Sequence, residues 1–209
     1  MLETSKISHV YKGTQRFEFP EVICQSNQTL LVIGASGVGK TTLLHVLGGI
    51  LKPLEGNVRI DNQSLYEMSG NRLDKFRGQN IGIVFQKPHF VQAISAEENL
   101  LLAQKLSSNK TNKDQVKGLL ERLNLDHRAH SRISTMSQGE LQRLSIARSI
   151  INRPKLILAD EPTSALDDNN CKEVIQLLDQ QSKELNAALI IVTHDNRLKQ
   201  YFNDHIELS

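Results

Sequence analysis

Short apolar runs and helix-like stretches alternate along this chain. Four nearly continuous apolar runs are residues 30–33, 81–85, 156–159 and 189–192. Such runs are typical of parallel strands that are buried on both faces. After the third run, Val174 and Leu178 recur at helical spacing, and a short helix near Arg197 precedes a final strand over residues 205–208. Strands that alternate with helices predict a mostly parallel α/β sheet.

The N-terminal third predicts further strands and one helix. Residues 6–11 and 16–19 alternate weakly between apolar and polar positions, and residues 57–61 predict an edge strand. A helical pattern follows the first apolar run, over residues 41 to about 50. This part of the chain therefore adds short strands to the sheet-forming region.

The middle third is predominantly helical. Residues 95–98 form a Ser-x-x-Glu capping pattern, and residues 111–114 offer a second helix start. A third helix is expected from Gln138 onward. Residues 127–130 hold two histidines three positions apart, which we interpret as a solvated helix end or loop rather than a zinc pair. We expect a helical lobe over about residues 88–152.

Composition narrows the function classes. The 209 residues include 25 Lys plus Arg and 23 Asp plus Glu, for a formal net charge of +2. This near balance does not support the basic stripe of a nucleic-acid-binding surface, so we expect no nucleic-acid partner. The two cysteines, Cys24 and Cys171, lie far apart in the sequence. A disulfide framework is therefore not expected, and a reducing, cytosolic compartment fits best.

The apolar runs are too short to cross a membrane. A spanning helix needs about 18–20 consecutive apolar residues, whereas the best run covers residues 187–192. The N-terminal residues also lack the basic-then-apolar layout of a signal peptide. If this protein acts at a membrane, we expect a separate chain to supply the spans.

A glycine-rich segment follows the first apolar run. Residues 34–41, Gly-Ala-Ser-Gly-Val-Gly-Lys-Thr, match the phosphate-binding pattern G-x-x-x-x-G-K-[ST]. The glycines let backbone N–H groups point at phosphate oxygens, and the next helix aims its positive end at the same anion. Lys40 is then expected at the β- and γ-phosphates and Thr41 at Mg²⁺. A glycine-rich turn that binds nothing is the alternative, which the strand before it and the helix after it disfavour.

Two acidic residues, Asp160 and Glu161, end the third apolar run. In a phosphate-loop enzyme, the strand-end Asp holds the Mg²⁺ shell. The adjacent Glu is then placed to polarise the attacking water. Alone, two acids after an apolar strand mark a solvated loop start. The upstream phosphate loop and the Pro-Thr-Ser-Ala-Leu-Asp sequence that follows favour the catalytic interpretation.

In this order, the motifs resemble those of the ATP-binding-cassette (ABC) ATPases over nearly the whole chain. Residues 136–140, Met-Ser-Gln-Gly-Glu, resemble the family signature Leu-Ser-Gly-Gly-Gln. Ser137 and Gly139 are retained, and the resemblance implies that the Ser137 hydroxyl and the Gly139 N–H meet the γ-phosphate. Ser137 is also expected to cap the helix that follows it.

Other elements of the family follow in order. Gln86 resembles the glutamine that touches Mg²⁺ or water and senses the helical lobe. His194 resembles the switch histidine that contacts the γ-phosphate, and residues 164–167 resemble the loop that spans the dimer interface. Tyr11 matches the aromatic residue that stacks on adenine, with an amphipathic strand position as its alternative.

The resemblance thus implies ATP and Mg²⁺ as cofactors and a set of site residues. The expected catalytic residues are Glu161, His194 and Gln86, and the expected Mg²⁺ contacts are Thr41, Gln86 and Asp160. The expected nucleotide contacts are Tyr11, Gly34, Ala35, Ser36, Gly37, Val38, Gly39, Lys40, Thr41, Thr42, Ser137, Gly139 and Asp167.

The resemblance also implies a P-loop NTPase α/β fold. A mostly parallel sheet core is expected with an N-terminal antiparallel β lobe and an inserted helical subdomain. A single nucleotide-binding domain would span residues 1–209. Its RecA-like core and β lobe would occupy about 1–87 and 153–209, and the signature subdomain about 88–152.

For partners, the resemblance implies an ATP-dependent, head-to-tail homodimer and an integral membrane permease subunit, contacted through residues 86–99. The location implied is cytoplasmic, peripheral on the inner face of the cell membrane. Residues 81–86 and 96–100 resemble the lipoprotein-release and macrolide-export branch. The expected function is the ATP-binding and hydrolysing subunit of a bacterial ABC transporter. The alternative is the ABC ATPase of a non-transport complex of the cell-division or envelope-regulating type.

Overall fold

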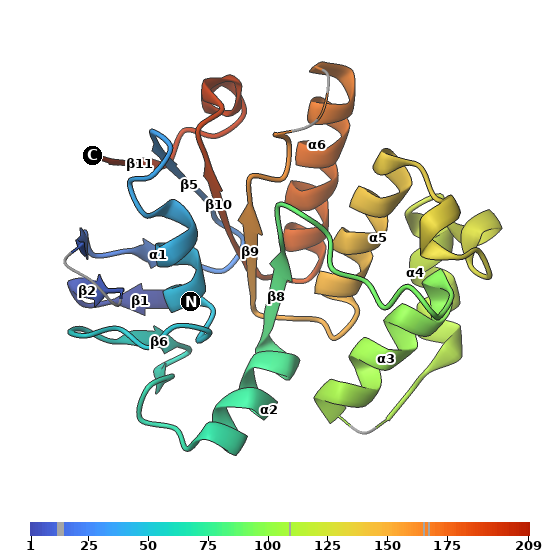
Figure 1. Cartoon of the computed structure of the whole chain (residues 1–209), viewed down its shortest axis with the longest axis horizontal. Helices are drawn as coiled ribbons and strands as arrows, with labels where there is room; N and C mark the ends of the chain where they lie inside the picture. The colour runs from blue at the N-terminus through green and yellow to red at the C-terminus, as the bar shows by residue number, and fades with distance from the viewer. Residues whose placement is uncertain (12–14, 109, 165, 167) are drawn as a thin grey trace.

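A five-stranded parallel sheet forms the centre of the molecule (Figure 1). The computed structural model describes residues 1–11, 15–108, 110–164, 166 and 168–209. The strands, in spatial order, are β11 (His205–Leu208), β5 (Thr29–Gly34), β10 (Ala188–Thr193), β9 (Leu156–Asp160) and β8 (Ile81–Val84). All four pairings are parallel, with Ile190 opposite both Leu30 and Leu158. The four apolar runs and the final strand are confirmed as the strands of this sheet.

The central strands β5, β10 and β9 are apolar except at their ends because helices or strands cover both faces of the sheet. On β5, Leu31 and Ile33 belong to a core that includes residues of α5 (Gln138–Ile150) and α6 (Asp168–Glu184). Leu30 and Val32 face the opposite way, into a core shared with α1 (Lys40–Leu47) and the N-terminal strands. Figure 1 shows these two layers on either side of the parallel sheet.

The N-terminal strands form two small antiparallel sheets. One sheet has the order β4 (Ile23–Cys24), β1 (Leu2–Thr4), β6 (Val58–Ile60) and β7 (Gln63–Ser64). The other pairs β2 (Ile7–Val10) with β3 (Arg16–Phe19). The prediction that residues 57–61 form an edge strand is wrong, because β6 is paired on both sides. Its flanking strands are too short to show alternation in the sequence.

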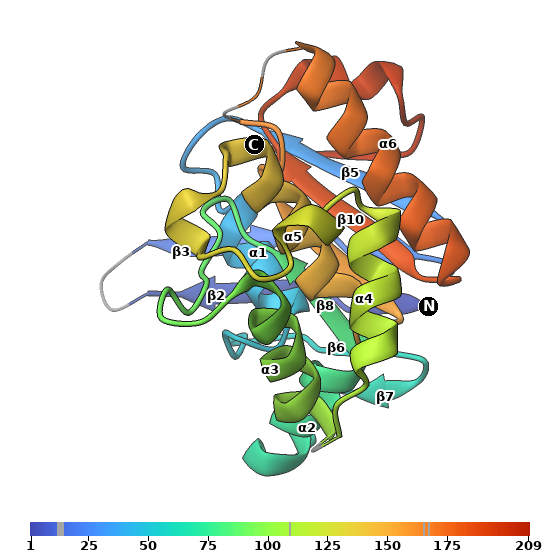
Figure 2. The ribbon, with the colours of Figure 1, turned by 90° about the vertical axis from the view of Figure 1, so that its right-hand side faces the viewer.

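Helices fill the segment between β8 and β9. They are α3 (Ala96–Ser108), α4 (Lys113–Arg122), the 3₁₀ turns η1 (Asp126–Arg128) and η2 (Ile133–Thr135), and α5. The predicted cap of α3 is confirmed, because the Ser95 hydroxyl accepts from Glu98 N and the Glu98 carboxylate accepts from Ser95 N. Figure 2 shows α3, α4 and α5 together in front of the sheet. The short helix near Arg197 is the 3₁₀ helix η3 (Asn196–Gln200).

One helix, α2 (Gly70–Asn80), was not predicted from the sequence. None of its residues is fully buried, and its apolar residues Leu73 and Phe76 are only half-buried against the core. It packs on α3, where a Cβ added to Gly78 would lie 3.1 Å from Ser107 Cα. In the part of the chain that the structure describes, no helix combines the length and apolar character needed to cross a membrane.

Candidate nucleotide site

The glycine-rich loop joins β5 to α1 in a left-handed turn. Gly37 and Gly39 have φ angles of +88° and +97°, which side chains with a Cβ rarely adopt. Gly39 is the N-cap of α1, and a Cβ there would lie only 2.6 Å from Phe17 Cδ1. The first helical N–H groups of α1 have no partner within the helix, so the loop and helix start together offer donors to an anion.

Lys40, the first residue of α1, reaches back over this loop. Its Nζ donates to Gly34 O at 2.9 Å and to Ala35 O at 2.8 Å. The same Nζ lies 3.7 Å from Glu161 Oε1, and both side chains are buried. The ammonium is therefore held between the loop and Glu161, the residue directly after β9.

Thr41 and Asp160 meet directly beneath the loop. The Thr41 hydroxyl donates to Asp160 Oδ2 at 3.0 Å and to Oδ1 at 3.2 Å. Burial raises the pKa of the Asp160 carboxyl, while the hydrogen bond from Thr41 lowers it. A hydroxyl and a carboxylate, both hard oxygen ligands, are a donor set that fits Mg²⁺.

Glu161 has a strained backbone and a highly organised side chain. Its φ of +46° lies in the left-handed region, which costs roughly 1–3 kcal/mol for a residue other than glycine. The carboxylate accepts from the Thr193 hydroxyl at 2.9 Å and from His194 N at 3.1 Å. His194 Nδ1 lies 2.8 Å from Glu161 Oε1. The ends of β9 and β10 thus hold one carboxylate with three donors.

One cavity of about 440 Å³ gathers most of these groups. Its size falls within the range of roughly 300–1,000 Å³ that is usual for small-molecule sites. Its lining residues are Phe17, Ser36, Gly37, Gly39, Lys40, Thr41, Thr42, Gln86, Glu161 and His194. The predicted residues Gly34, Ala35 and Val38 belong to the same loop, and Asp160 adjoins the cavity through Thr41.

Three predicted residues lie apart from this lining. Tyr11 is 45% exposed, its hydroxyl lies 3.1 Å from the Thr42 hydroxyl, and its ring meets Phe17 edge-on. Among the residues that the structure describes, those lining the cavity do not include Ser137 or Gly139, which lie at the start of α5. Asp167 lies outside the described residues.

The signature turn is a complete capping box. The Ser137 hydroxyl accepts from Glu140 N at 3.3 Å, and Glu140 Oε2 accepts from Ser137 N at 2.7 Å. The predicted cap by Ser137 is confirmed. One turn further along, Gln142 Nε2 donates to Pro162 O at 3.0 Å. The helix that carries the signature is therefore bonded to the residue directly after Glu161.

Sequence reasoning missed three contributors to this region. Phe17 was predicted only as a strand position, yet its ring lies against Gly39 and lines the cavity. Thr193 was given no role, although its hydroxyl is fully buried on Glu161. Arg128 belongs to the segment interpreted as a solvated helix end or loop, and its Nε donates to Glu140 Oε1 at 2.7 Å. The acidic residue at position 140 was the one feature of the sequence that could have indicated the Arg128–Glu140 ion pair.

A parallel sheet with a strand, β5, that runs into a phosphate loop defines a P-loop nucleotide hydrolase. Comparison with known proteins gives the family: residues 20–164 match the ABC transporter family, and the chain belongs to it. It is the ATP-binding, ATP-hydrolysing subunit of a bacterial ABC transporter.

Curated relatives are similar over most of their length. The lipoprotein-releasing system ATP-binding protein LolD of Idiomarina loihiensis is 39% identical over 84% of this chain and 78% of its own. The LolD protein of Shewanella frigidimarina is 34% identical over 95% of this chain and 85% of its own. Among solved structures, the dimeric ATP-binding cassette MJ0796 bound to ADP and Pi has a TM-score of 0.89 and 29% identity. That match covers 100% of this chain and 94% of the other.

Proposed function

We propose that this chain drives a separate membrane subunit through ATP-dependent dimerisation, with the cavity described above as its nucleotide site. The observation that carries the proposal is that one cavity gathers Lys40, Glu161 and His194 from three different elements. The same constellation serves phosphoryl transfer to water: a cation for the phosphates, a base for the water, and a side chain at the terminal phosphate.

Each of these side chains has a role set by its geometry. Lys40 and the loop N–H groups would hold the β- and γ-phosphates, and Thr41 with Asp160 and Gln86 would hold Mg²⁺, whose charge offsets that of the phosphates. The Glu161 carboxylate is oriented by Thr193 and His194, so it can align and deprotonate a water molecule. Tyr11 and Asp167 stay predictions for the adenine side and the dimer interface.

A head-to-tail dimer would bring the signature to this site. Ser137 and Gly139 lie at the start of α5, whereas the cavity is lined from the loop before α1. In a dimer of this kind, the signature of one subunit closes on the γ-phosphate held by the other. ATP then favours the dimer because it makes contacts that only the closed state offers. The solved cassette that this chain resembles is itself dimeric.

The membrane partner is proposed to bind a groove between α2, β8, α3 and α5. This groove has a volume of about 660 Å³, and its lining includes Ile50, Phe85, His89, Leu106 and Arg148. Of these residues, Leu106 is 78% exposed. We infer that residues 88–152 move as one lobe when Gln86 responds to the nucleotide, and so pull on a partner in the groove.

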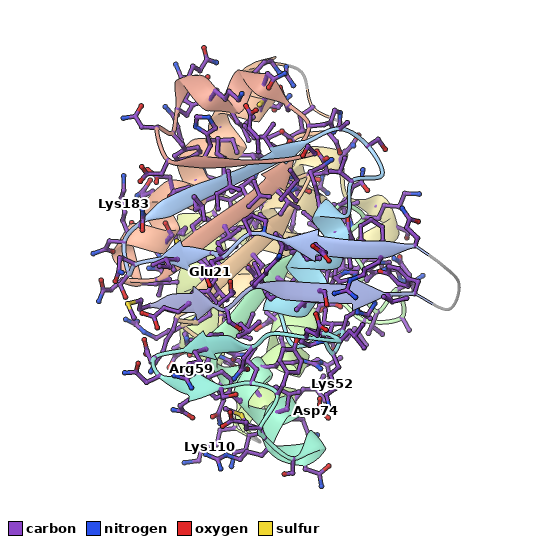
Figure 3. All side chains as sticks on the ribbon, turned by 90° about the vertical axis from the view of Figure 1, so that its left-hand side faces the viewer. Glu21, Lys52, Arg59, Asp74, Lys110 and Lys183 are labelled. Atoms are coloured by element: carbon purple, nitrogen blue, oxygen red, sulfur yellow. The ribbon has the colours of Figure 1, made fainter. Side chains whose placement is uncertain are left out.

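The relatives indicate the branch. Several curated relatives are ATP-binding proteins of lipoprotein-releasing systems, so we propose a lipoprotein-releasing type of transporter and a position on the inner face of the cell membrane. We keep the prediction that nucleic acid is no partner. Figure 3 labels the acidic residues Glu21 and Asp74 in the same view as basic residues such as Lys52 and Arg59.

Disulfide crosslinking between subunits tests the dimer. Ser36→Cys and Gln138→Cys place thiols at exposed positions beside the loop and in the signature. Both native cysteines, Cys24 and Cys171, are buried. In mixtures of the two single variants, each also carrying Glu161→Gln, Mg-ATP should produce a heterologous crosslink. An equal yield of crosslink with and without Mg-ATP, or a crosslink between two Ser36→Cys subunits instead, would overturn the head-to-tail arrangement. Glu21→Cys paired with Gln138→Cys is the control.

A further inference from the structure

A carboxylate lies in the signature turn itself. Glu140 is buried in the first turn of α5, three residues after Ser137 and next to Gly139. Its pKa is lowered to about 2, first by the hydrogen bond from Ser137 N and then by the one from Arg128. The group is therefore ionised at neutral pH. In the proposed dimer this turn faces the partner's γ-phosphate, and two anions at close range repel.

Arg128 is placed to offset that charge. It ends the separate turn η1, and its Nε donates to Glu140 Oε1 at 2.7 Å, while Glu140 Oε2 remains bonded to Ser137 N. The His127 Nε2 atom lies 3.5 Å from the same Oε1. The carboxylate is thus shared between the cap of α5 and the side chains of Arg128 and His127.

We propose that Arg128 is a positioning residue for ATP-dependent dimerisation. Its guanidinium neutralises Glu140, so the signature turn can accept the γ-phosphate of the ATP that the partner subunit holds. The inference rests on the head-to-tail dimer proposed above. It differs from a purely structural tie between η1 and α5. If the hydrogen bond only held η1 to α5, removing Arg128 or removing Glu140 would weaken dimerisation equally. If Arg128 acts by neutralising charge, dimerisation is weakened only when Arg128 is removed and the Glu140 carboxylate remains.

The test is a double-mutant cycle on ATP-dependent dimerisation. Four proteins, all carrying Glu161→Gln, are compared: the parent, Arg128→Gln, Glu140→Gln and the double variant. The readout is the Mg-ATP concentration that gives half-maximal dimer. Arg128→Gln should raise it by about tenfold or more, as expected for one uncompensated like charge, while Glu140→Gln and the double variant should stay within about threefold of the parent.

Two measurements separate this role from lost folding. Nucleotide binding by the dilute monomer should be unchanged in all four proteins, because the cavity lies on the other lobe. Arg122→Gln removes an exposed arginine that pairs with Glu184 at 3.9 Å, and it should leave dimerisation unaffected. Equal effects of Arg128→Gln, Glu140→Gln and the double variant, or no effect of Arg128→Gln, would overturn this inference alone. A parent that never dimerises with ATP would overturn the proposed function and this inference with it.

Discussion

The His194 ring and the Glu161 carboxylate lie 2.8 Å apart, from Nδ1 to Oε1, at the ends of two adjacent parallel strands. An ionised carboxylate accepts hydrogen bonds but donates none. Nδ1 is therefore the donor, and the bond fixes the orientation of the ring. With the Thr193 hydroxyl on the other oxygen, Glu161 is held from both sides. The residue proposed to activate water is thus oriented by the residue proposed to contact the γ-phosphate.

Lys40→Ala should weaken ATP binding by at least about 100-fold, because it removes charge-assisted hydrogen bonds to the phosphates. Nucleotide affinity with Mg²⁺, measured by isothermal titration calorimetry, checks this. Lys52→Ala, at an exposed lysine, is the control. Unchanged turnover in Lys40→Ala would show that this loop is not the nucleotide site.

Glu161→Gln should retain ATP binding and lose about 10²–10⁴-fold in hydrolysis rate, since the amide keeps the shape but not the basicity. The variant should also accumulate as an ATP-bound dimer. Single-turnover phosphate release and gel filtration with and without ATP measure the two effects. A monomer with full activity at high ATP would contradict both the role of Glu161 and the dimer.

Thr193→Val and His194→Ala should each lower kcat by about 10–100-fold with little change in ATP binding, because each removes a hydrogen bond to the ionised Glu161. Steady-state kinetics separates kcat from KM. Thr29→Val is the matched control, since Thr29 also donates to a carboxylate, Asp179, but away from the cavity. A rise in KM with unchanged kcat would place these residues in binding rather than in catalysis.

Phe90 and Val91 directly follow His89, which lines the proposed partner groove, so polar substitutions there should uncouple the chain from its membrane subunit. Phe90 lies under Arg148, whose Cζ is 4.6 Å from the ring centroid, while Val91 is 45% exposed. Val91→Ser is therefore the cleaner variant, and Phe90→Ser is expected to lower the melting temperature as well. ATP binding should survive while co-purification and partner-stimulated ATPase activity fall together.

The control for this experiment is Ile23→Ser, which removes an exposed apolar side chain far from the groove in the N-terminal sheet. Persistence of both co-purification and stimulation in a folded Val91→Ser variant would place the coupling surface elsewhere.

Glu140 should make the stability of the folded protein decrease as the pH falls into the acid range. Its folded pKa, about 2, is below its ordinary value of 4.5. The stabilisation is therefore complete above pH 4.5 and is lost as the pH falls from 4.5 toward 2. The melting-temperature difference between the native protein and Glu140→Gln should narrow from about pH 6 to about pH 3. Glu21→Gln, at an exposed site, should show no such trend, and a constant difference for Glu140→Gln would contradict the pairing.

The sequence was most informative where chemistry and chain order coincide. The loop over residues 34–41 is one contiguous segment, and so is the pair Asp160–Glu161. Each comes at the end of an apolar run that is buried on both faces of the sheet. Phe17 could not be found in this way. Its place in the cavity depends on how close the β2–β3 sheet comes to Gly39, which local pattern does not encode.

Very short elements, such as the three-residue strand β1, and the weakly buried helix α2 were the ones missed. Helix α2 has no fully buried residue, so its apolar side chains give no clear stripe. Strands β4 and β7 have two residues each, which is too short for any alternation to register. Tertiary packing alone defines such elements.

The hydrogen bond from Gln142 to the carbonyl of Pro162 bears on when the two subunits of the proposed dimer hydrolyse ATP. It links the helix start that would grasp the neighbour's nucleotide to the backbone beside the chain's own catalytic glutamate. In the proposed dimer, a displacement of Ser137 would reach the backbone next to Glu161 through about one and a half turns of helix and this bond. In the proposed head-to-tail dimer, each subunit would therefore respond, at its own reaction centre, to the nucleotide that its neighbour holds. The two sites would then hydrolyse ATP together, and one defective subunit would inactivate both.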